Sequence, residues 1–246
     1  MQLRYRKGPL RFCEVWFNEA PPKGNWLAPY RNVDVILFME SRVAVSPRSS
    51  PFRNGVVALE PATNQLFSMF NSGFRNEVRR ASKEGITSGP STAVDGLGAA
   101  YLAYARFCRS KHITAMSYAT LKRYDRAGHL LVSVATLGSI VVQVHLYMVG
   151  MDEAVLLASF PMCADVPGKV TGWANRALHW ADIVQFKEAG LLWCNLGGMG
   201  NPVTDHNRAI VAFKNEMCPA EVFYYQDAVA VSLLGKCYLW LKRLIK

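Results

Sequence analysis

The spacing of apolar residues between Ala174 and Gly198 changes abruptly at Gly190. Before that glycine, apolar positions recur at helical spacing and predict an amphipathic helix of about four turns. We expect its apolar face to contain Ala177, Trp180, Ala181, Val184 and Phe186, and its polar sides Arg176, Asp182, Lys187 and Glu188. After it, Leu191–Leu196 is too short for a helix and predicts a buried strand that enters a Gly-Gly turn. Such helix-to-strand units are typical of α/β or α+β enzymes, in which ligands bind at strand ends.

The rest of the chain shows a similar alternation of short apolar runs and amphipathic segments. Strands are predicted at Phe12–Phe17, Val33–Met39 and Val56–Leu59, in a meander through Val134, Val144 and Leu156, and at Glu221–Val231. Helices are predicted at Leu66–Glu84, at Leu97–Lys111, around Phe213 and at Gly235–Lys246. The segment Val43–Phe52 is rich in Ser, Pro and Arg and predicts a loop or lid.

A Gly/Ser/Pro-rich stretch, Thr87–Gly98, is the best candidate for a boundary between two lobes. We therefore divide the chain into an N-terminal lobe, residues 1–98, and a C-terminal lobe, residues 99–246. The apolar segment Leu130–Met151 resembles a membrane span, but Gln143, His145 and a turn at Gly138 favour two strands of a hairpin. No stable membrane span is expected.

Composition limits the class of protein. Of 246 residues, 51% are apolar and only 19% are charged, which indicates a folded chain with a substantial core. Lys and Arg outnumber Asp and Glu by 28 to 18, a formal net charge of +10. This balance indicates an anionic partner, such as a phosphate-bearing cofactor, nucleic acid, an acidic carrier protein or a membrane face, or else a generally basic soluble protein.

The cysteines and the N-terminal residues indicate the cellular compartment of the protein. The six cysteines include no CxxC pair, and the histidines complete no zinc pattern, so no metal is expected. We interpret most of the cysteines as buried free thiols in a reducing cytoplasm. The first residues contain no apolar segment of the kind found in signal peptides.

Three motifs, taken together, resemble one family. The first comprises Leu178–Trp180, Phe186–Gly190 and Asn195–Gly198, the second is Ile210–Glu216 with its Phe-Lys pair, and the third is the basic helix Phe74–Ile86. In their order along the chain, with the basic helix first and the Phe-Lys pair last, they are similar to the FemAB-like branch of the GNAT N-acyltransferase superfamily. The resemblance implies an α/β (α+β) GNAT-like fold, with a mixed central sheet flanked by helices and an incomplete N-terminal lobe packed on a C-terminal core. The long coiled-coil insertion of many peptidoglycan-bridge members is not visible.

The resemblance also implies where an acyl donor binds. In this fold an acyl-pantetheine arm lies between the strands before and after the main helix, here Ala154–Phe160 and Leu191–Leu196. The cofactor-binding candidates at the helix N-terminus are Gly168, Lys169, Gly172, Trp173 and Asn175. The usual signature Gln/Arg-x-x-Gly-x-Gly/Ala is not matched, because Gly168 and Gly172 are too far apart. Coenzyme A is a donor that the resemblance implies, but the missing signature counts against its free form and leaves room for a phosphopantetheine thioester on an acyl carrier protein or for aminoacyl-tRNA. The alternative interpretation of the segment is an ordinary loop.

Three residues are candidates for catalysis. By resemblance, Lys214 directs a cation at the reaction centre to stabilise an oxyanion or hold a phosphate. His145, in an apolar strand, and His206, next to Asp205 in a polar loop, are candidate general bases. The alternatives are a solvated lysine, a packed strand histidine and a turn residue.

Substrate-binding candidates are more scattered. Arg75 and Arg79 belong to a basic helix face that either contacts phosphate or is solvated, and Asn195 belongs to the motif before the Gly-Gly turn. Trp26 and Tyr30 lie in a Pro/Gly loop and are candidates to stack on a base or sugar ring. Apolar and basic residues of the C-terminal Tyr238–Lys246 separate by face, which favours either an anionic membrane surface or a docking helix.

These observations predict an N-acyltransferase that moves an acyl group from a thioester to a primary amine, with no cysteine nucleophile. By resemblance to small members of the family, the preferred acceptor is a nucleotide-linked amino sugar used in cell-surface polysaccharide. Two alternatives stay open: an aminoacyl-tRNA-dependent transferase, which the positive charge favours, and a non-catalytic binding module, which the missing phosphate-loop signature favours.

Overall fold

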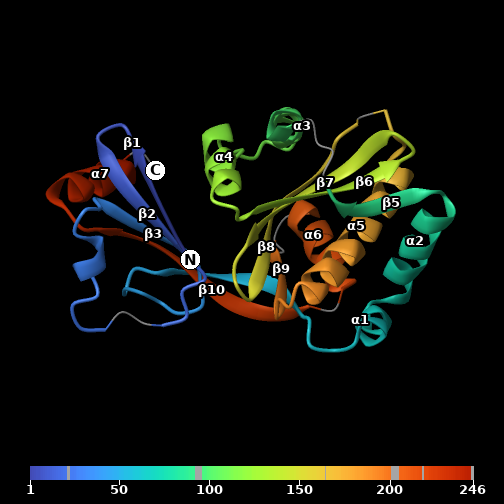
Figure 1. The fold of residues 1–246 in the computed structure, drawn as a ribbon, viewed down its shortest axis with the longest axis horizontal. Coiled ribbons are helices and arrows are strands. Elements are labelled where there is room, and N and C mark those ends of the chain that lie inside the picture. Colours follow the sequence, from blue (N-terminus) through green and yellow to red (C-terminus); the bar gives the residue numbers. More distant parts are fainter. Residues whose placement is uncertain (21–22, 92–95, 164, 201–204, 218, 245–246) are drawn as a thin grey trace. The chain divides into compact units, whose positions relative to one another are not determined.

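A computed structural model describes residues 1–246 except 21–22, 92–95, 164, 201–204, 218 and 245–246; the side chains of 96 and 205–207 are also outside the description. The chain forms two compact units (Figure 1). Unit 1 comprises Met1–Asn54 and Val222–Lys246, and unit 2 comprises Gly55–Glu221. The boundary predicted between residues 98 and 99 falls inside a helix of unit 2, because the last strand of the chain returns to pair with the N-terminal strands.

Unit 1 is built on a mixed sheet with the order β1-β2-β3-β10, and β4 continues beside β10. The strands are β1 (Gln2–Lys7), β2 (Leu10–Trp16), β3 (Val35–Ser41), β4 (Ser50–Ala58) and β10 (Ala220–Ala230). β2 and β3 are parallel, whereas β1 pairs with β2 and β10 with β3 in antiparallel fashion. β4 and β10 each cross the boundary between the units.

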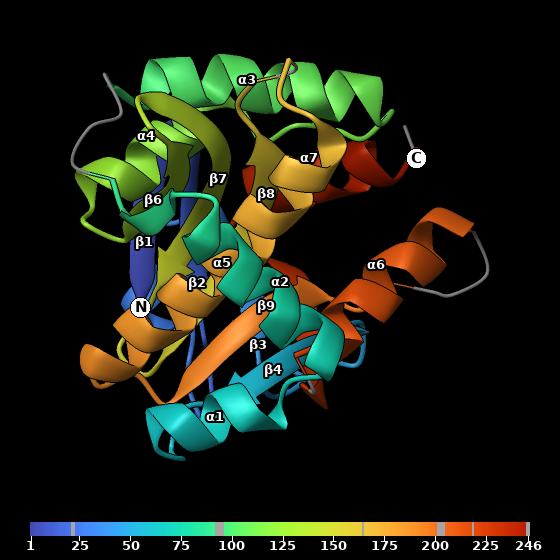
Figure 2. The same ribbon diagram turned by 90° about the vertical axis from the view of Figure 1, so that its right-hand side faces the viewer.

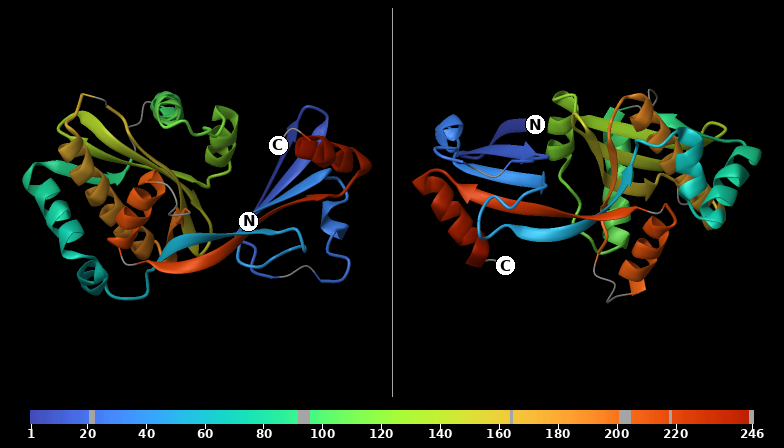
Figure 3. Two further views of the ribbon diagram at one scale, coloured as in Figure 1. Left: turned by 180° about the vertical axis from the view of Figure 1, so that it is seen from behind. Right: turned by 90° about the horizontal axis from the view of Figure 1, so that it is seen from below.

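Each face of the unit 1 sheet is covered. The short helix η1 (Ala28–Tyr30) and the residues before it pack on one face, around a core of Cys13, Val15, Val33, Ile36 and Phe38. Helix α7 (Leu233–Leu244) packs on a second core around Phe12 and Val35, through Tyr238 and Leu239 (Figure 3). The C-terminal helix is therefore part of the unit formed by the N-terminal strands.

Unit 2 contains a sheet with the order β4-β9-β8-β7-β6-β5. Its other strands are β5 (Ile86–Pro90), β6 (Leu130–Leu137), β7 (Ile140–Val149), β8 (Glu153–Pro161) and β9 (Trp193–Gly198). β5 to β8 are antiparallel neighbours, and β9 joins β8 in parallel. The segment predicted as a lobe boundary thus contributes the edge strand β5.

Helices cover both faces of this sheet (Figures 1 and 2). The helices of unit 2 are α1 (Thr63–Met69), α2 (Ser72–Lys83), α3 (Gly96–Ser110), α4 (Tyr118–Arg126), α5 (Gly168–Glu188) and α6 (Asp205–Asn215). α2 and α5 pack together on one face, and α3 and α4 lie on the other. The core beneath α5 contains Phe74, Tyr147, Ile183, Phe186 and Leu196.

The predicted element order holds through the second half of the chain except for α4, and two predicted helices have other bounds. One predicted helix over Leu66–Glu84 is two helices, because Asn71 caps the second by accepting a hydrogen bond from the Phe74 amide. α5 begins at Gly168 and is longer than predicted, and α4 was not predicted. The mixed sheet with flanking helices confirms the predicted fold class.

Candidate functional site

A cavity of about 440 Å³ opens in unit 2 where β8 and β9 part. The two parallel strands are in register only from Glu153↔Trp193 to Val155↔Asn195. Beyond that point β8 continues and lines the cavity with Leu156–Ser159, while Leu196 of β9 lines the other side. The remaining wall comes from α3 and the segment after it, α5 and α6: Tyr104, Phe107, Lys111, Ile113, Asn175, His179, Ala209, Ile210, Phe213 and Lys214. The predicted gap between these strands is confirmed.

Buried polar contacts hold the strands at the point where they diverge. Asn195 donates through Nδ2 to Glu153 Oε1 at 2.7 Å, and its Oδ1 accepts from the Gly197 amide at 2.8 Å. Gly197 has a φ of +76°, and a Cβ there would lie 3.1 Å from the Leu156 carbonyl oxygen. Glycine is therefore required at this position both by its backbone conformation and by the close approach of β8.

Helix α6 is fixed against α5 by a charged pair. Arg176 donates to both oxygens of Glu216, from Nε and Nη2, each at 2.8 Å, and its Nη1 lies 3.0 Å from Glu77 Oε2. The same guanidinium lies over the Phe213 ring, 5.0 Å from its centroid. Lys214 follows, and its ammonium donates to the Gly198 carbonyl at 2.6 Å. A bidentate Arg–carboxylate pair is a geometrically specific contact, so it sets where the predicted Phe-Lys pair meets the cavity.

Directly behind the cavity wall lies a buried polar network. His145 Nδ1 lies 2.7 Å from Asp182 Oδ2, and both side chains are fully buried. His145 Nε2 lies 2.9 Å from Asn175 Oδ1. The Asn175 oxygen also accepts from Ser159 at 3.0 Å and Gln143 at 3.0 Å. Both ring nitrogens of His145 are thus engaged, and Asn175 and Ser159 form the side of the network that faces the cavity.

His179 links this network to the cavity. Its ring centroid lies 4.3 Å from that of His145 and 5.4 Å from that of Phe213. Burial lowers the pKa of His179 well below its ordinary value, and the charges of His145, Lys214 and Arg176 lower it further. His179 is therefore a neutral imidazole at neutral pH, and its buried Nδ1 has no hydrogen-bond partner among the described residues.

Other titratable groups around Asp182 are held in their neutral forms. Burial raises the pKa of the Tyr147 hydroxyl well above its ordinary value, and Asp182 raises it further. Burial, Asp182 and Glu153 likewise raise the pKa of the Cys194 thiol. A protonated, fully buried thiol is not a nucleophile, so Cys194 is not a candidate to attack the donor.

The candidates for donor binding divide along α5. Asn175 lines the cavity, whereas Lys169 and Trp173 do not. Trp173 packs with the core between α5 and β5, and the cations of Lys169 and Arg80 lie over its ring at 5.2 and 5.4 Å. Gly168 and Gly172 lie in the first turns of α5, and a Cβ at either would meet nothing closer than Arg176 Nη1 at 3.8 Å.

The candidates for substrate binding are held by contacts within the fold. Arg75 donates to the carbonyls of Ser68 and Phe70, and Arg79 lies over the Phe67 ring, so both brace α1 against α2. Asn195 is buried in the strand contact described above.

In unit 1, Trp26 packs against Tyr30 and Phe38, and Tyr30 is itself buried, with its hydroxyl accepting from Gln2. The Tyr30 ring is therefore part of a core rather than an exposed stacking surface.

The catalytic candidates have three different outcomes. Lys214 lines the cavity, and His145 lies behind its wall rather than in it. His206 lies in the first turn of α6 rather than in the predicted loop, and its side chain is outside the described residues. Within the described ranges, no three His, Cys, Asp or Glu side chains are grouped to hold a metal ion. Also within them, no helix is both long enough and apolar enough to cross a bilayer.

Sequence reasoning missed the most buried polar residue of the main helix. Asp182 and Arg176 were placed on its polar sides, away from the apolar face, but Asp182 is fully buried and Arg176 contacts Glu77 of α2 and Glu216 after α6. The reason is that α5 is covered on more than one side, by the sheet, α2 and α6, so no wide solvated face remains. The spacing of His179 and Asp182, three apart on one helix face, was a usable signal together with His145.

Comparison with known proteins adds information on fold. In sequence, the chain matches no family model and no curated protein. Among solved structures it is similar to FemX, with a TM-score of 0.64 and 12% identity over 97% of this chain and 85% of that one. It is also similar to L-PGS from Bacillus licheniformis (TM-score 0.55, 13% identity, 99% and 85% covered).

A third similar structure is the C-terminal DUF2156 domain of a protein from Agrobacterium fabrum that is provisionally described as a lysylphosphatidylglycerol synthetase (TM-score 0.56, 12% identity, 99% and 84% covered). At these identities the likeness concerns the fold. The chain has the GNAT-like acyltransferase fold.

Proposed function

We propose that unit 2 is an acyltransferase whose reaction takes place in the cavity between β8 and β9. The observation that carries this proposal is the separation of two parallel strands beyond Val155 and Asn195, with a cavity opening where they part. The edge of β8 along Leu156–Ser159 is not paired with β9, so its backbone groups are available to the amides of a donor arm. The largely apolar wall suits an acyl chain and excludes water that would hydrolyse the donor.

The reaction needs three contributions from the chain. The lone pair of an acceptor amine attacks the donor carbonyl, the bond to the leaving group breaks, and the amine proton passes to the departing thiolate or to water. Lys214 stabilises the developing oxyanion, because its cation is held at the Gly197–Gly198 turn beside the gap. The imidazole of His179 is neutral, so it can accept a hydrogen bond from the acceptor amine and orient it. Arg176 fixes the helix that carries Lys214.

For the donor we propose a thioester of coenzyme A or of an acyl carrier protein, and for the acceptor the amine of a nucleotide-linked amino sugar. The N-terminus of the long helix α5 has no acidic residue in its first turn, which supports an anion site for the donor pyrophosphate. Thiol release from a panel of acyl-coenzyme A donors, in the presence and absence of amino sugars, tests the proposal. Acceptor-dependent release is expected; no release with any donor or carrier would contradict a thioester donor and leave the aminoacyl-tRNA donor and the binding-module alternative.

Donor placement has its own test. Gly172→Val leaves the fold intact, because a side chain at this position meets only the flexible end of Arg176. We expect it to raise the KM for the donor more than the KM for the acceptor, since a branched side chain crowds a pyrophosphate at the helix N-terminus. A changed acceptor KM with an unchanged donor KM would show that the donor phosphate binds elsewhere.

Aminoacyl-tRNA is a second candidate donor. Two observations favour it: the net charge of +10, and two lysines, Lys111 and Lys214, in the cavity wall. The description of one similar structure as a lysylphosphatidylglycerol synthetase, whose product carries a lysyl group, points the same way. Transfer of label from aminoacyl-tRNA, with a steep fall in tRNA binding as salt rises, would support this donor. Thiol release from coenzyme A without tRNA binding would exclude it.

A further inference from the structure

Helix α7 of unit 1 presents apolar side chains to solvent. Five of its residues are large, apolar and between 47% and 79% exposed: Leu233, Leu234, Trp240, Leu241 and Leu244. At 100° per residue they fall on one arc of the helix, opposite Gly235, Tyr238 and Leu239. Isolated exposed leucines are ordinary on protein surfaces, but a tryptophan and four leucines on one helix arc form a contiguous patch, and such patches mark an interaction site.

Specific contacts on the inner face of α7 fix the rotation of the helix about its axis, and thereby determine which residues face the solvent. A Cβ at Gly235 would lie 2.0 Å from the Asp34 carbonyl oxygen, so glycine allows the helix to approach β3 closely. Ser232 caps the helix by accepting from the Gly235 amide, and its hydroxyl donates to Asp34 at 2.7 Å. Arg11 donates to both oxygens of the same carboxylate. These contacts determine which side of α7 faces the core.

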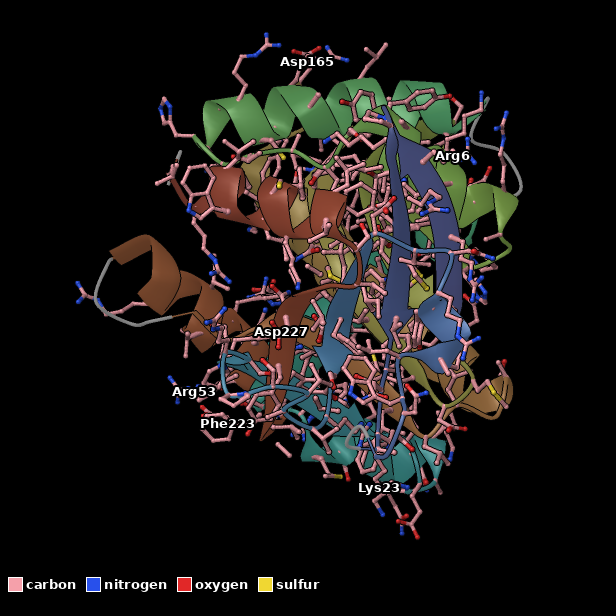
Figure 4. All side chains as sticks on the ribbon, turned by 90° about the vertical axis from the view of Figure 1, so that its left-hand side faces the viewer. Arg6, Lys23, Arg53, Asp165, Phe223 and Asp227 are labelled. Atoms are coloured by element: carbon pink, nitrogen blue, oxygen red, sulfur yellow. The ribbon has the colours of Figure 1, made fainter. Side chains whose placement is uncertain are left out.

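Basic residues lie beside the apolar arc: at 100° per residue, Lys236 and Arg243 follow it on one side of α7, and Lys242 lies near the end of the helix on its inner side. A hollow of about 710 Å³ beside α7 is lined by Arg48, Lys236 and Arg243 together with Trp240. Lys242 and Arg48 line an adjoining hollow. In the described part of the chain, none of these four cations has a carboxylate partner within ion-pair distance. The Asp227 carboxylate also lines both hollows, where Ser46 and Ser49 donate to it. Figure 4 looks onto α7, with Asp227 labelled beneath the helix.

We propose that the outer face of α7 docks unit 1 on an anionic phospholipid surface, with lipid phosphates at the flanking basic hollow. The combination of apolar residues, one tryptophan and flanking Lys and Arg on a single helix is that of helices lying in a membrane interface. With the apolar arc in the membrane, the cations would lie at the level of the lipid phosphates. Each cation near the surface adds to the electrostatic attraction between the helix and the anionic leaflet. The apolar arc then enters the boundary between headgroups and acyl chains.

A second copy of the chain is a poorer occupant of this face. Pairing two α7 helices would bring four cations of one copy against four of the other. The apolar arc also belongs to a single helix of 12 residues, whereas stable interfaces use about 20–30 residues from each partner. The charges that oppose self-association favour a lipid surface.

Flotation with vesicles of phosphatidylcholine, with and without phosphatidylglycerol, tests the proposal on the full chain. We expect binding only to vesicles that contain phosphatidylglycerol, weakening as salt rises. The double variant Trp240→Ser, Leu244→Ser should bind about tenfold more weakly or worse, because it removes apolar area from the arc. Phe223→Ser is the matched control, since Phe223 is an exposed apolar residue of β10 in the same unit.

Two double charge-reversal variants distinguish the effect of the cations beside α7 from the effect of the net charge of the chain. Lys236→Glu, Arg243→Glu should weaken binding about tenfold or more, whereas Arg6→Glu, Lys23→Glu changes the net charge equally at exposed sites away from α7 and should have a smaller effect. Glycerol phosphate in solution should not compete at equal phosphate concentration, because it supplies no surface for the apolar arc. Absence of vesicle binding, equal binding to neutral vesicles, or equal losses in both charge variants would overturn the proposal. So would a concentration-dependent dimer that the Trp240 variant abolishes without any vesicle binding.

Discussion

Helices α5 and α7 depart from the usual amphipathic pattern in opposite ways. α5 buries a carboxylate and a histidine, Asp182 and His179, among apolar side chains. α7 exposes leucines and Trp240, while only a narrow face packs on β2 and β3. A buried polar group requires partners, and an exposed apolar arc requires a surface to cover it. The two departures therefore indicate different functions: an internal reaction site in unit 2 and an external docking face in unit 1.

The largest effect is expected from removing the buried carboxylate of α5. Asp182→Ala leaves His145 without the acceptor of its Nδ1 in a site that water does not reach. Removing one partner of a buried ion pair lowers the free energy of unfolding by about 3–5 kcal/mol. Urea unfolding measures it, with exposed Asp125→Ala of α4 as the control. A loss of less than about 1 kcal/mol would mean that the network is not coupled to the fold.

Two glycines in helices should respond to alanine with opposite signs. Gly235→Ala places a Cβ against the Asp34 carbonyl and should destabilise unit 1 by about 1–3 kcal/mol, despite the better helix propensity of alanine. Gly172→Ala in α5 meets no close atom and should stabilise by about 0.5–1 kcal/mol. Thermal unfolding of both variants gives the signs. A stabilising Gly235→Ala would show that α7 does not approach β3 closely.

The next effect concerns the cation beside the gap. Lys214→Ala should lower kcat about tenfold or more with the fold retained, because one charge is lost from the reaction centre. It should also raise the pKa of His179, since the Lys214 charge contributes to keeping it low. Turnover and the NMR titration of the imidazole give the two readouts, and exposed Lys83→Ala in α2 is the control. Wild-type kcat would remove Lys214 from the mechanism.

The smallest effect is a dependence of stability on pH. The pKa of His179 is lowered in the folded chain, so the unfolded chain binds a proton first as pH falls. Stability should therefore be greatest above about pH 6.5, the unfolded-state pKa of histidine, and should decrease as pH falls below that value. His179→Gln should remove this part of the slope, whereas exposed His112→Gln should not. Equal slopes in both variants would mean that folding does not lower the pKa of His179.

Sequence patterns predicted the helices and strands better than they predicted which faces of those elements are buried. The change of period at Gly190 gave α5 and β9, and the motif around Phe213 and Lys214 placed a lysine at the cavity. Periodicity in one helix cannot reveal how many sides of it are covered, which is why Asp182 was assigned to a polar side rather than to the core. The same limit applies to α7, where the pattern showed an amphipathic helix but not which face packs on β3.

Long-range pairing explains the other differences. The lobe boundary was placed by composition, but β5 lies in that stretch and pairs with β6. β10 joins the N-terminal strands from the far end of the chain, a contact that no local pattern contains. The pairing of His145 with Asp182 joins a strand to a helix 37 residues later, so only the assembled fold brings the two side chains together.

Filling the gap between β8 and β9 tests the central claim most directly. Ala158 lines the cavity, whereas Ala127 is an exposed residue at the end of α4. Acyl transfer is measured in wild type, Ala158→Phe and Ala127→Phe, with unfolding curves for each. A ring in the cavity should lower transfer about hundredfold while the matched control stays close to wild type, because a donor arm and a phenyl ring cannot share the gap. Wild-type transfer by a folded Ala158→Phe variant would contradict a reaction site at this place.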